Sequence, residues 1–263
     1  PWSAMGSAAL KMPLLDVDYA MSAPGENTQV TNTALVAGSF TLTIAHYSIQ
    51  FEESYLATIT KPEGGYDVKL LAQELVNRTH LTMTDIVAAL FPSFTTAVSD
   101  TGVDLTVDHI YDTMFNLHSA LVPGPYYCVL YPQQMNDFVA SLRGETGAVQ
   151  WRQATDEMLK LRGPGYQGEW GNVQFWSSDS VNSANGGADS SGAMFGAGAI
   201  AYTEADPSAL LQFIPAEARV AGSKVFAEFS QVADYGKTRL NAHYFPAASI
   251  AENARGVEII TDR

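Results

Sequence analysis

Residues 186–201 read Gly186-Gly-Ala-Asp-Ser-Ser-Gly-Ala-Met-Phe-Gly-Ala-Gly-Ala-Ile-Ala201. Five glycines and five alanines surround a single bulky pair, Met194 and Phe195. Side chains this small bring little apolar volume for a core of their own, but they let neighbouring backbones approach closely. We therefore predict that this segment packs against other parts of a fold, with Met194 and Phe195 facing its interior.

The composition indicates a folded chain with few charges. Of its 263 residues, 46% are hydrophobic and 16% are charged, well below the roughly 25% of charged residues in an average soluble protein. A chain of this length forms one large domain or two small ones. A surface with so few charges is expected where neighbouring molecules cover much of it.

The charge balance argues against binding to nucleic acid. The net charge is −14, from 28 acidic and 14 basic residues, and no run of lysine or arginine is present. Proteins that grip phosphates carry a clustered basic patch, so direct binding of DNA or RNA is not expected. No run of about 18 apolar residues is found, so no transmembrane helix is expected. Cys128 is the single cysteine and lies in an apolar run, which predicts a buried thiol.

The first third of the chain combines extended and helical patterns. Residues 1–38 have no clean period and are expected to form an extended arm. Phe40, Leu42 and Ile44 alternate with threonines, and residues 55–60 continue this strand-like composition. Residues 67–94 follow helical spacing, with a predicted interruption at residues 79–84.

The middle of the chain predicts a layer of helices and strands. Residues 106–121 form a helix that Thr106 caps and whose apolar stripe includes Ile110 and Leu121. An apolar strand at residues 126–131 precedes Pro132, which opens a helix over residues 133–142. This order is typical of an α/β layer.

The last third predicts mainly strands. Residues 171–176 form a strand, and residues 177–191 form a polar loop. Residues 225–244 form a hairpin around residues 234–236, and residues 257–260 form a final strand.

No motif predicts catalysis or metal binding. Residues 196–201 match the loose dinucleotide pattern G-x-G-x-x-A, which requires a hydrophobic strand before it and a helix after it. Here the preceding residues are polar, so close packing is the favoured interpretation. Asp108, His109 and Asp112 lie within little more than one turn and are expected to form a solvated helix face. We predict no catalytic residue, no metal site and no cofactor.

Three blocks carry a family resemblance. The first runs from Leu105 through Pro123-Gly-Pro125 to Phe138, the second is Gly192–Tyr202, and the third is the hairpin Val225–Tyr244. Their order resembles that of the major capsid proteins of tailed bacteriophages, which have the Hong Kong 97-type fold. The resemblance implies an α+β chain with an N-terminal arm, an extended β-loop, a peripheral domain with a long spine helix, and an axial α/β domain.

The resemblance also implies a division of the chain. The expected parts are the N-terminal arm at 1–38, the extended β-loop at 39–66, the spine helix of the peripheral domain at 67–96, the axial domain at 97–221, and the return strands of the peripheral domain at 222–263.

The function implied by the resemblance is structural rather than enzymatic. Copies of the chain are expected to form hexamers and pentamers that close an icosahedral shell around double-stranded DNA without binding it specifically, with portal and scaffolding or decoration proteins as partners. The protein would be part of the virion and would be assembled in the cytoplasm of a host bacterium, with no membrane involved. The residues expected to contact neighbouring subunits are Phe40, Leu42, Ile44, Tyr55 and Lys61.

Two alternatives remain open at the level of sequence. An encapsulin-like nanocompartment has the same fold and encloses cargo protein instead of DNA. An α/β enzyme with a glycine-rich cofactor loop at residues 196–201 belongs to a different class of protein.

Overall fold

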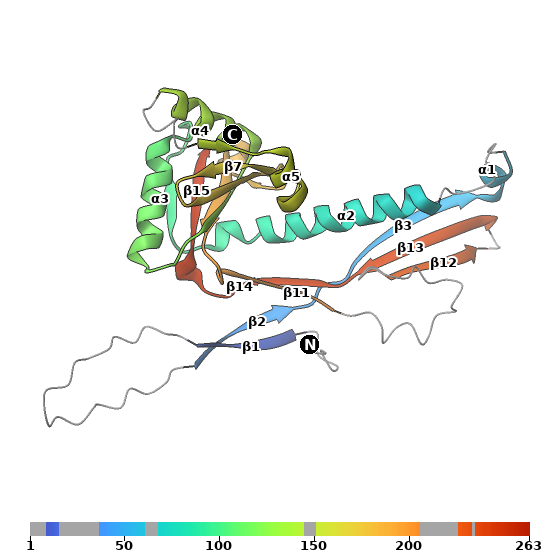
Figure 1. Cartoon of the computed structure of the whole chain (residues 1–263). Coiled ribbons are helices and arrows are strands. Elements are labelled where there is room, and N and C mark those ends of the chain that lie inside the picture. The colour runs from blue at the N-terminus through green and yellow to red at the C-terminus, as the bar shows by residue number, and fades with distance from the viewer. Residues whose placement is uncertain (1–8, 16–36, 61–67, 145–150, 206–225, 233–234) are drawn as a thin grey trace, which may run out of the picture.

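The computed structural model describes residues 9–15, 37–60, 68–144, 151–205, 226–232 and 235–263. Figure 1 shows two parts of different shape, a compact head and a long arm that projects from it. We use "head" for residues 89–195 and 251–263, and "arm" for residues 46–60, 68–88, 226–232 and 235–245, within the described ranges. Short strands at the base of the arm join the two parts.

The head is built around an eight-stranded mixed sheet. From edge to edge the strands are β4 (Ala97–Ser99), β15 (Gly256–Asp262), β10 (Asp189–Phe195), β5 (Tyr126–Leu130), β8 (Val173–Ser177), β7 (Tyr166–Trp170) and β6 (Trp151–Gln153), with β9 (Asn182–Ala184) paired to β10. The β15–β4 and β5–β8 pairs are parallel, and the other pairs are antiparallel.

The small-residue stretch provides the central strand, β10. A Cβ atom added to Gly192 would lie 2.8 Å from the carbonyl oxygen of Val129 and 3.0 Å from Cδ2 of Leu130. The neighbouring strand and its side chains therefore approach a position that only glycine leaves free. Met194 is fully buried, and Phe195 packs partly buried on the opposite face of the sheet. The prediction of a closely packed segment is confirmed.

Two helices cover one face of the sheet. They are α3 (Val107–Ser119) and α4 (Pro132–Gly144). The backbone N–H of Thr106 donates to Nδ1 of His109 at 3.1 Å, which fixes the start of α3 as predicted. The core between helices and sheet includes Ile110, Leu117, Phe138, Cys128, Leu130, Phe175, Met194 and Ile259.

The remaining helical elements are short. Helix α5 (Asp156–Arg162) joins β6 to β7. Single 3-10 turns lie at η1 (Phe91–Ser93), η3 (Asn185–Gly187) and η8 (Asn253–Arg255). Phe91 packs against the second face of the sheet together with Phe94 and Ala193, so both faces of the head sheet are covered.

A buried glutamine connects α4 to strands β10 and β15. The Gln134 amide nitrogen donates to the Ser190 carbonyl at 2.9 Å and to Oγ1 of Thr261 at 2.8 Å. The Gln134 amide oxygen accepts the backbone N–H of Tyr131 at 3.1 Å. Because the side chain is fully buried, these bonds take the place of the hydrogen bonds that its amide would make to water in the unfolded chain.

Replacing Gln134 with alanine is expected to lower the free energy of unfolding by about 2–4 kcal/mol, because buried groups on three elements lose their partner. Gln133→Ala is the matched control, since Gln133 is exposed and bonds only to Asp137 in the described contacts; its effect should stay below about 0.5 kcal/mol. Urea unfolding of both variants measures the difference. Equal losses for the two variants would contradict this role for Gln134.

The arm is a three-stranded antiparallel sheet with a helix along it. Strand β13 (Lys237–Tyr244) lies between β12 (Phe226–Val232) and β3 (Tyr47–Ser54), and α2 (Val68–Ala88) runs from the arm into the head (Figure 1). The β12–β13 pair is the predicted hairpin.

Two strand pairs form the base of the arm. Strand β1 (Ala9–Leu15) pairs with β2 (Ala37–Thr43), and β11 (Ile200–Glu204) pairs with β14 (Pro246–Ile250). The hydroxyl groups of Tyr202 and Tyr244 donate to Oε1 of Glu204 at 2.6 and 2.7 Å, and burial raises the pKa of Tyr244 to about 12. These neutral phenols therefore stay donors at physiological pH and hold β11 to the arm strand β13.

Four predictions of local structure are wrong. Residues 55–60 form helix α1 (Tyr55–Thr60) instead of a strand. The pairing of β3 with β13 ends at Ser54, because the chain turns at Gly236, just before β13 begins. Helix α2 is continuous through residues 79–84, where three threonine hydroxyls bond to carbonyls four residues earlier. The predicted loop at residues 177–191 contains β9 and the start of β10. Leu121 is 83% exposed, because α3 ends before it.

The predicted boundary at residue 222 also differs from the observed sheets. It groups the last strand with the peripheral part, whereas β15 pairs with β10 and β4 in the head. Val257 and Ile259 point into the head core, which explains why this strand belongs there.

Candidate assembly surfaces

The far end of the arm exposes apolar side chains. Tyr55 and Leu56 open α1 and are 38% and 71% exposed. Tyr235, 72% exposed, directly precedes Gly236, the residue to which Tyr55 bonds. The N–H of Tyr55 donates to the Gly236 carbonyl at 2.8 Å, which holds α1 against the β12–β13 turn. These residues form what we call the arm tip. No other described part of the subunit reaches this end of the arm (Figure 1).

Cross-strand ion pairs stiffen the arm behind the tip. Glu52 on β3 accepts from Lys237 Nζ at 3.0 Å and from Arg239 Nε at 2.6 Å, both on β13. The hydrogen bonds from Lys237 and Arg239 lower the pKa of Glu52, so its carboxylate stays ionised. Leu75 of α2 packs on Leu240 beneath the helix. The arm thus has its own small core within the subunit.

The five predicted contact residues differ in their surroundings. Phe40 and Ile44 are half-buried in and after β2, and Tyr55 is exposed at the arm tip. Leu42 is 2% exposed, so its side chain is already covered within the subunit and is not available to a neighbour. Lys61 lies outside the described residues.

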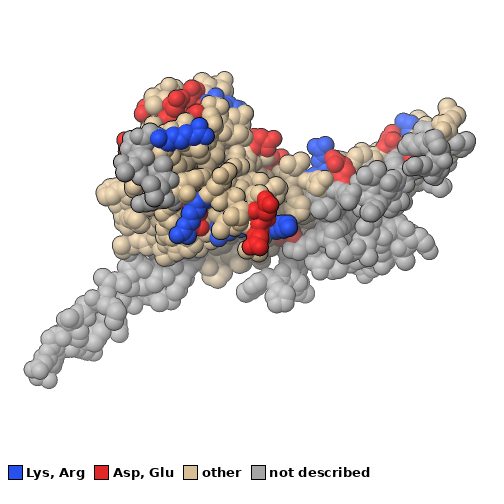
Figure 2. Space-filling model, turned by 45° about the horizontal axis from the view of Figure 1, so that its top comes forward, with Lys and Arg blue, Asp and Glu red and all other residues tan. Residues whose placement is uncertain are grey.

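Sequence reasoning missed an aromatic surface on α3. Tyr111 and Phe115 are exposed, Phe115 by 69%, and they share this outer face with Asp108 and Asp112. The signal was present, because the four residues follow i, i+3, i+4, i+7 spacing opposite the buried stripe. Most of the described surface that is visible in Figure 2 carries no charge, in keeping with the composition.

The glycine-rich loop does not have the geometry of a dinucleotide site. The chain passes from β10 through a tight turn into β11, a strand, where the motif requires a helix. Arg255 Nη1 donates to the Ala197 carbonyl at 3.1 Å and holds the turn against the end of the head. Gly198 has φ +87°, which a glycine adopts without strain. This turn therefore serves packing, and Glu217, near the distance expected for a ribose ligand, lies outside the described residues.

Ionisable groups in the described ranges do not assemble a metal site. No group of three His, Cys, Asp or Glu side chains with metal-binding geometry is found there. His109 is engaged in capping α3, and burial raises the pKa of the Cys128 thiol. Among the described helices, none has the length and hydropathy to cross a membrane.

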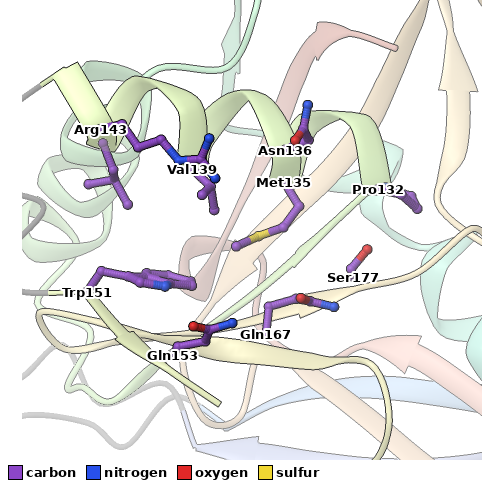
Figure 3. Close-up of a pocket in the computed structure, with 10 residues that line it drawn as sticks. Pro132, Met135, Asn136, Val139, Arg143, Trp151, Gln153, Gln167 and Ser177 are labelled. Atoms are coloured by element: carbon purple, nitrogen blue, oxygen red, sulfur yellow. The ribbon is translucent and has the colours of Figure 1, made fainter.

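A cavity of about 550 Å³ lies between α4 and strands β6, β7 and β8. Figure 3 shows Met135 pointing from α4 toward Trp151, with the amides of Gln153 and Gln167 below. Arg143 is the one charged residue among those that line it in the described structure.

Comparison with known proteins finds relatives by structure alone. No protein-family model and no curated protein sequence matches the chain. The capsid of Helicobacter pylori bacteriophage KHP30 is similar with a TM-score of 0.69 and 13% identity, covering 100% of this chain and 86% of that one. The capsid of cyanophage P-SCSP1u gives a TM-score of 0.66 and 12% identity over 99% and 85%.

A third similar structure is an encapsulin. The SrpI encapsulin of Synechococcus elongatus gives a TM-score of 0.59 and 10% identity, covering 100% of this chain and 83% of that one. In all three comparisons the head and the arm are matched together, since nearly the whole chain is covered. The chain therefore has the α+β Hong Kong 97-type shell fold seen in these phage capsid and encapsulin structures.

Proposed function

We propose that this chain is the major capsid protein of a tailed double-stranded DNA bacteriophage, and that its copies form hexamers and pentamers that close an icosahedral head. The observation that carries the proposal is the likeness to phage capsid structures over 99–100% of the chain, arm included. The exposed arm tip supports it, since apolar side chains at the end of a projection gain free energy when a neighbour removes them from water.

The proposal assigns roles to the parts of the chain. The head acts as the axial domain around each hexamer or pentamer, and the arm carries the extended β-loop and the spine helix α2. Phe40, Ile44 and Tyr55 are proposed to contact adjacent subunits, together with Leu56. The shell is part of the virion and assembles in the host cytoplasm with portal and scaffolding or decoration proteins. It encloses DNA without specific binding, needs no cofactor and performs no catalysis.

An encapsulin-like compartment is the second candidate. It is favoured by the match to the SrpI encapsulin, which covers 100% of this chain, as the KHP30 capsid does. We rank the phage role first because the KHP30 and P-SCSP1u capsids give TM-scores of 0.69 and 0.66, against 0.59 for the encapsulin.

Electron microscopy of the full chain after expression in bacteria tests the proposal. Hexamers, pentamers or closed shells are expected, because heterologous contacts repeated around an axis close into rings. Uniform small shells that retain a co-purified protein would favour the compartment instead. A chain that stays monomeric at about 100 µM, far above the micromolar range of modest protein contacts, would overturn both readings.

A further inference from the structure

The cavity between α4 and strands β6, β7 and β8 combines an apolar wall with polar side chains from every one of these elements. Trp151 is the aromatic residue that lines it, beside aliphatic side chains of α4. Its polar residues are Asn136, Arg143, Gln153, Gln167 and Ser177. The volume of about 550 Å³ lies within the range of roughly 300–1,000 Å³ that small-molecule sites occupy.

These five polar side chains do not hold the fold together. Within the described part of the chain, no hydrogen bond or ion pair involves any of them. An amide both donates and accepts hydrogen bonds, and so does a hydroxyl group. The cavity therefore presents a set of donors and acceptors that a polar ligand can use.

A β-bulge places Gln167 in the cavity. Residues four apart in a regular strand point to the same face of a sheet. Here Trp170 packs in the core beneath α4, whereas Tyr166 contacts Trp176 on the other face of the sheet. The register of β7 against β8 shifts at Gln167, which is the extra residue. Bulges of this kind redirect a side chain and are frequent beside binding sites.

Gly168 leaves room for the indole ring of Trp151. A Cβ atom at Gly168 would lie 2.8 Å from Cζ2 of Trp151. Phe138 and Phe175 contact the ring at centroid distances of 6.0 and 5.7 Å and fix its position. In Figure 3 the ring lies across the cavity from Arg143 of α4. Because Trp151 is only half-buried, the part of its ring that faces the cavity is open to a ligand.

The charge at the cavity favours an anionic ligand. Arg143 is exposed, and no described aspartate or glutamate lines the cavity with it, although the net charge of the chain is −14. A guanidinium group forms short, charge-assisted hydrogen bonds to a carboxylate, often two at once. An anionic group of a ligand would therefore meet a cation here without a competing carboxylate.

We propose that this cavity binds an acidic saccharide, with a sugar ring against Trp151 and its carboxylate on Arg143. A pyranose ring has a face of C–H groups that packs on an aromatic ring, and hydroxyl groups around its edge. The amides of Gln153 and Gln167 and the hydroxyl of Ser177 bond to those hydroxyl groups. A wholly apolar ligand would leave the amides unpaired, and a nucleic acid would find one cation for many phosphates.

Isothermal titration calorimetry of the full chain tests the proposal. The probes are digalacturonate and sialyllactose, with lactose as the neutral saccharide. At least one acidic probe should bind with a Kd of about 1 mM or tighter, and lactose should bind at least about tenfold more weakly. Because the site lies within one subunit, the result does not depend on assembly, and its failure would leave the shell function standing.

Two exposed positions supply the variants. Arg143→Met keeps an unbranched side chain but removes the charge, so the acidic probe should bind at least about tenfold more weakly and no better than lactose. Gln153→Ala should weaken binding about threefold. Arg152→Met is the matched control, because Arg152 is exposed on the same strand but does not line the cavity. Its affinity should equal that of the original chain, and thermal unfolding checks that all three variants fold.

Four results would overturn the proposal. The first is that neither acidic probe binds at about 10 mM, and the second is that lactose binds as tightly as the acidic probes. The third is equal affinity of Arg143→Met and Arg152→Met, or of Gln153→Ala and the original chain, which would place the ligand elsewhere. The fourth is tighter binding of uridine monophosphate than of either acidic saccharide, which would assign the cavity to a nucleotide.

Discussion

Gly192→Val is expected to leave almost no folded protein. The first added carbon would stand 2.8 Å from the Val129 carbonyl oxygen, 3.0 Å from Leu130 and 3.1 Å from Oε1 of Gln134. Strand β10 cannot move away, because β5 and β15 hold it on both sides. Overpacking alone costs about 1–3 kcal/mol, and displacing Gln134 breaks a buried network as well. The total of more than about 4 kcal/mol is a large part of the stability of an ordinary domain.

The yield of soluble protein and thermal unfolding measure this effect. Ala197→Val is the matched control, since it introduces the same side chain at an exposed position in the turn five residues later. Its effect should stay within about 0.5 kcal/mol. A Gly192→Val protein with the same melting temperature as the original chain would show that the close approach of β5 to Gly192 is not required.

Local signals predicted three elements of the head, α3, β5 and α4. Thr106 before an apolar stripe predicted the start of α3, and Pro132 after an apolar run predicted both the end of β5 and the start of α4. These signals act within a few residues, so they can be interpreted without tertiary structure. The small residues at 186–201 also predicted one tertiary feature, the close packing of this segment against other parts of the fold, because side chains this small leave room for a neighbouring backbone.

Several of the errors concern positions where a distant part of the chain decides the structure. Residues 55–60 have a strand-like composition, yet strand β13, which pairs with β3, begins only after the turn at Gly236 and leaves them without a strand to pair with. Leu42 alternates like an exposed contact residue but is buried inside the subunit. The position of β15 in the head sheet is likewise a pairing across the chain. Periodicity identifies a strand but not the strand it pairs with.

The candidate assembly surfaces were only partly predictable for the same reason. Tyr55 was predicted from its place in an extended segment, and the structure leaves it exposed. Tyr111 and Phe115 share a helix with buried residues, and only the orientation of α3 shows which face is outward. Which exposed side chains meet a neighbour depends on geometry between subunits, which no pattern within one chain encodes.

Leu56→Asp at the arm tip is expected to abolish assembly without destabilising the subunit. Leu56 is 71% exposed, so an aspartate there remains hydrated in the monomer, and the free energy of unfolding should change by less than about 0.5 kcal/mol. In the proposed shell the same position is covered by a neighbour. An unpaired carboxylate buried in that contact costs several kcal/mol, repeated at every copy of the interface.

Analytical ultracentrifugation and electron microscopy show whether this variant is a monomer or an assembled ring or shell. We expect a monomer with the melting temperature of the original chain and no rings or shells. Asn77→Asp is the matched control, because Asn77 is exposed on α2 and adds the same charge away from the arm tip. Shells that form from Leu56→Asp as readily as from the control would show that the arm tip stays in solvent. Loss of assembly in both variants would instead trace the effect to net charge, which already stands at −14 and opposes the approach of like copies.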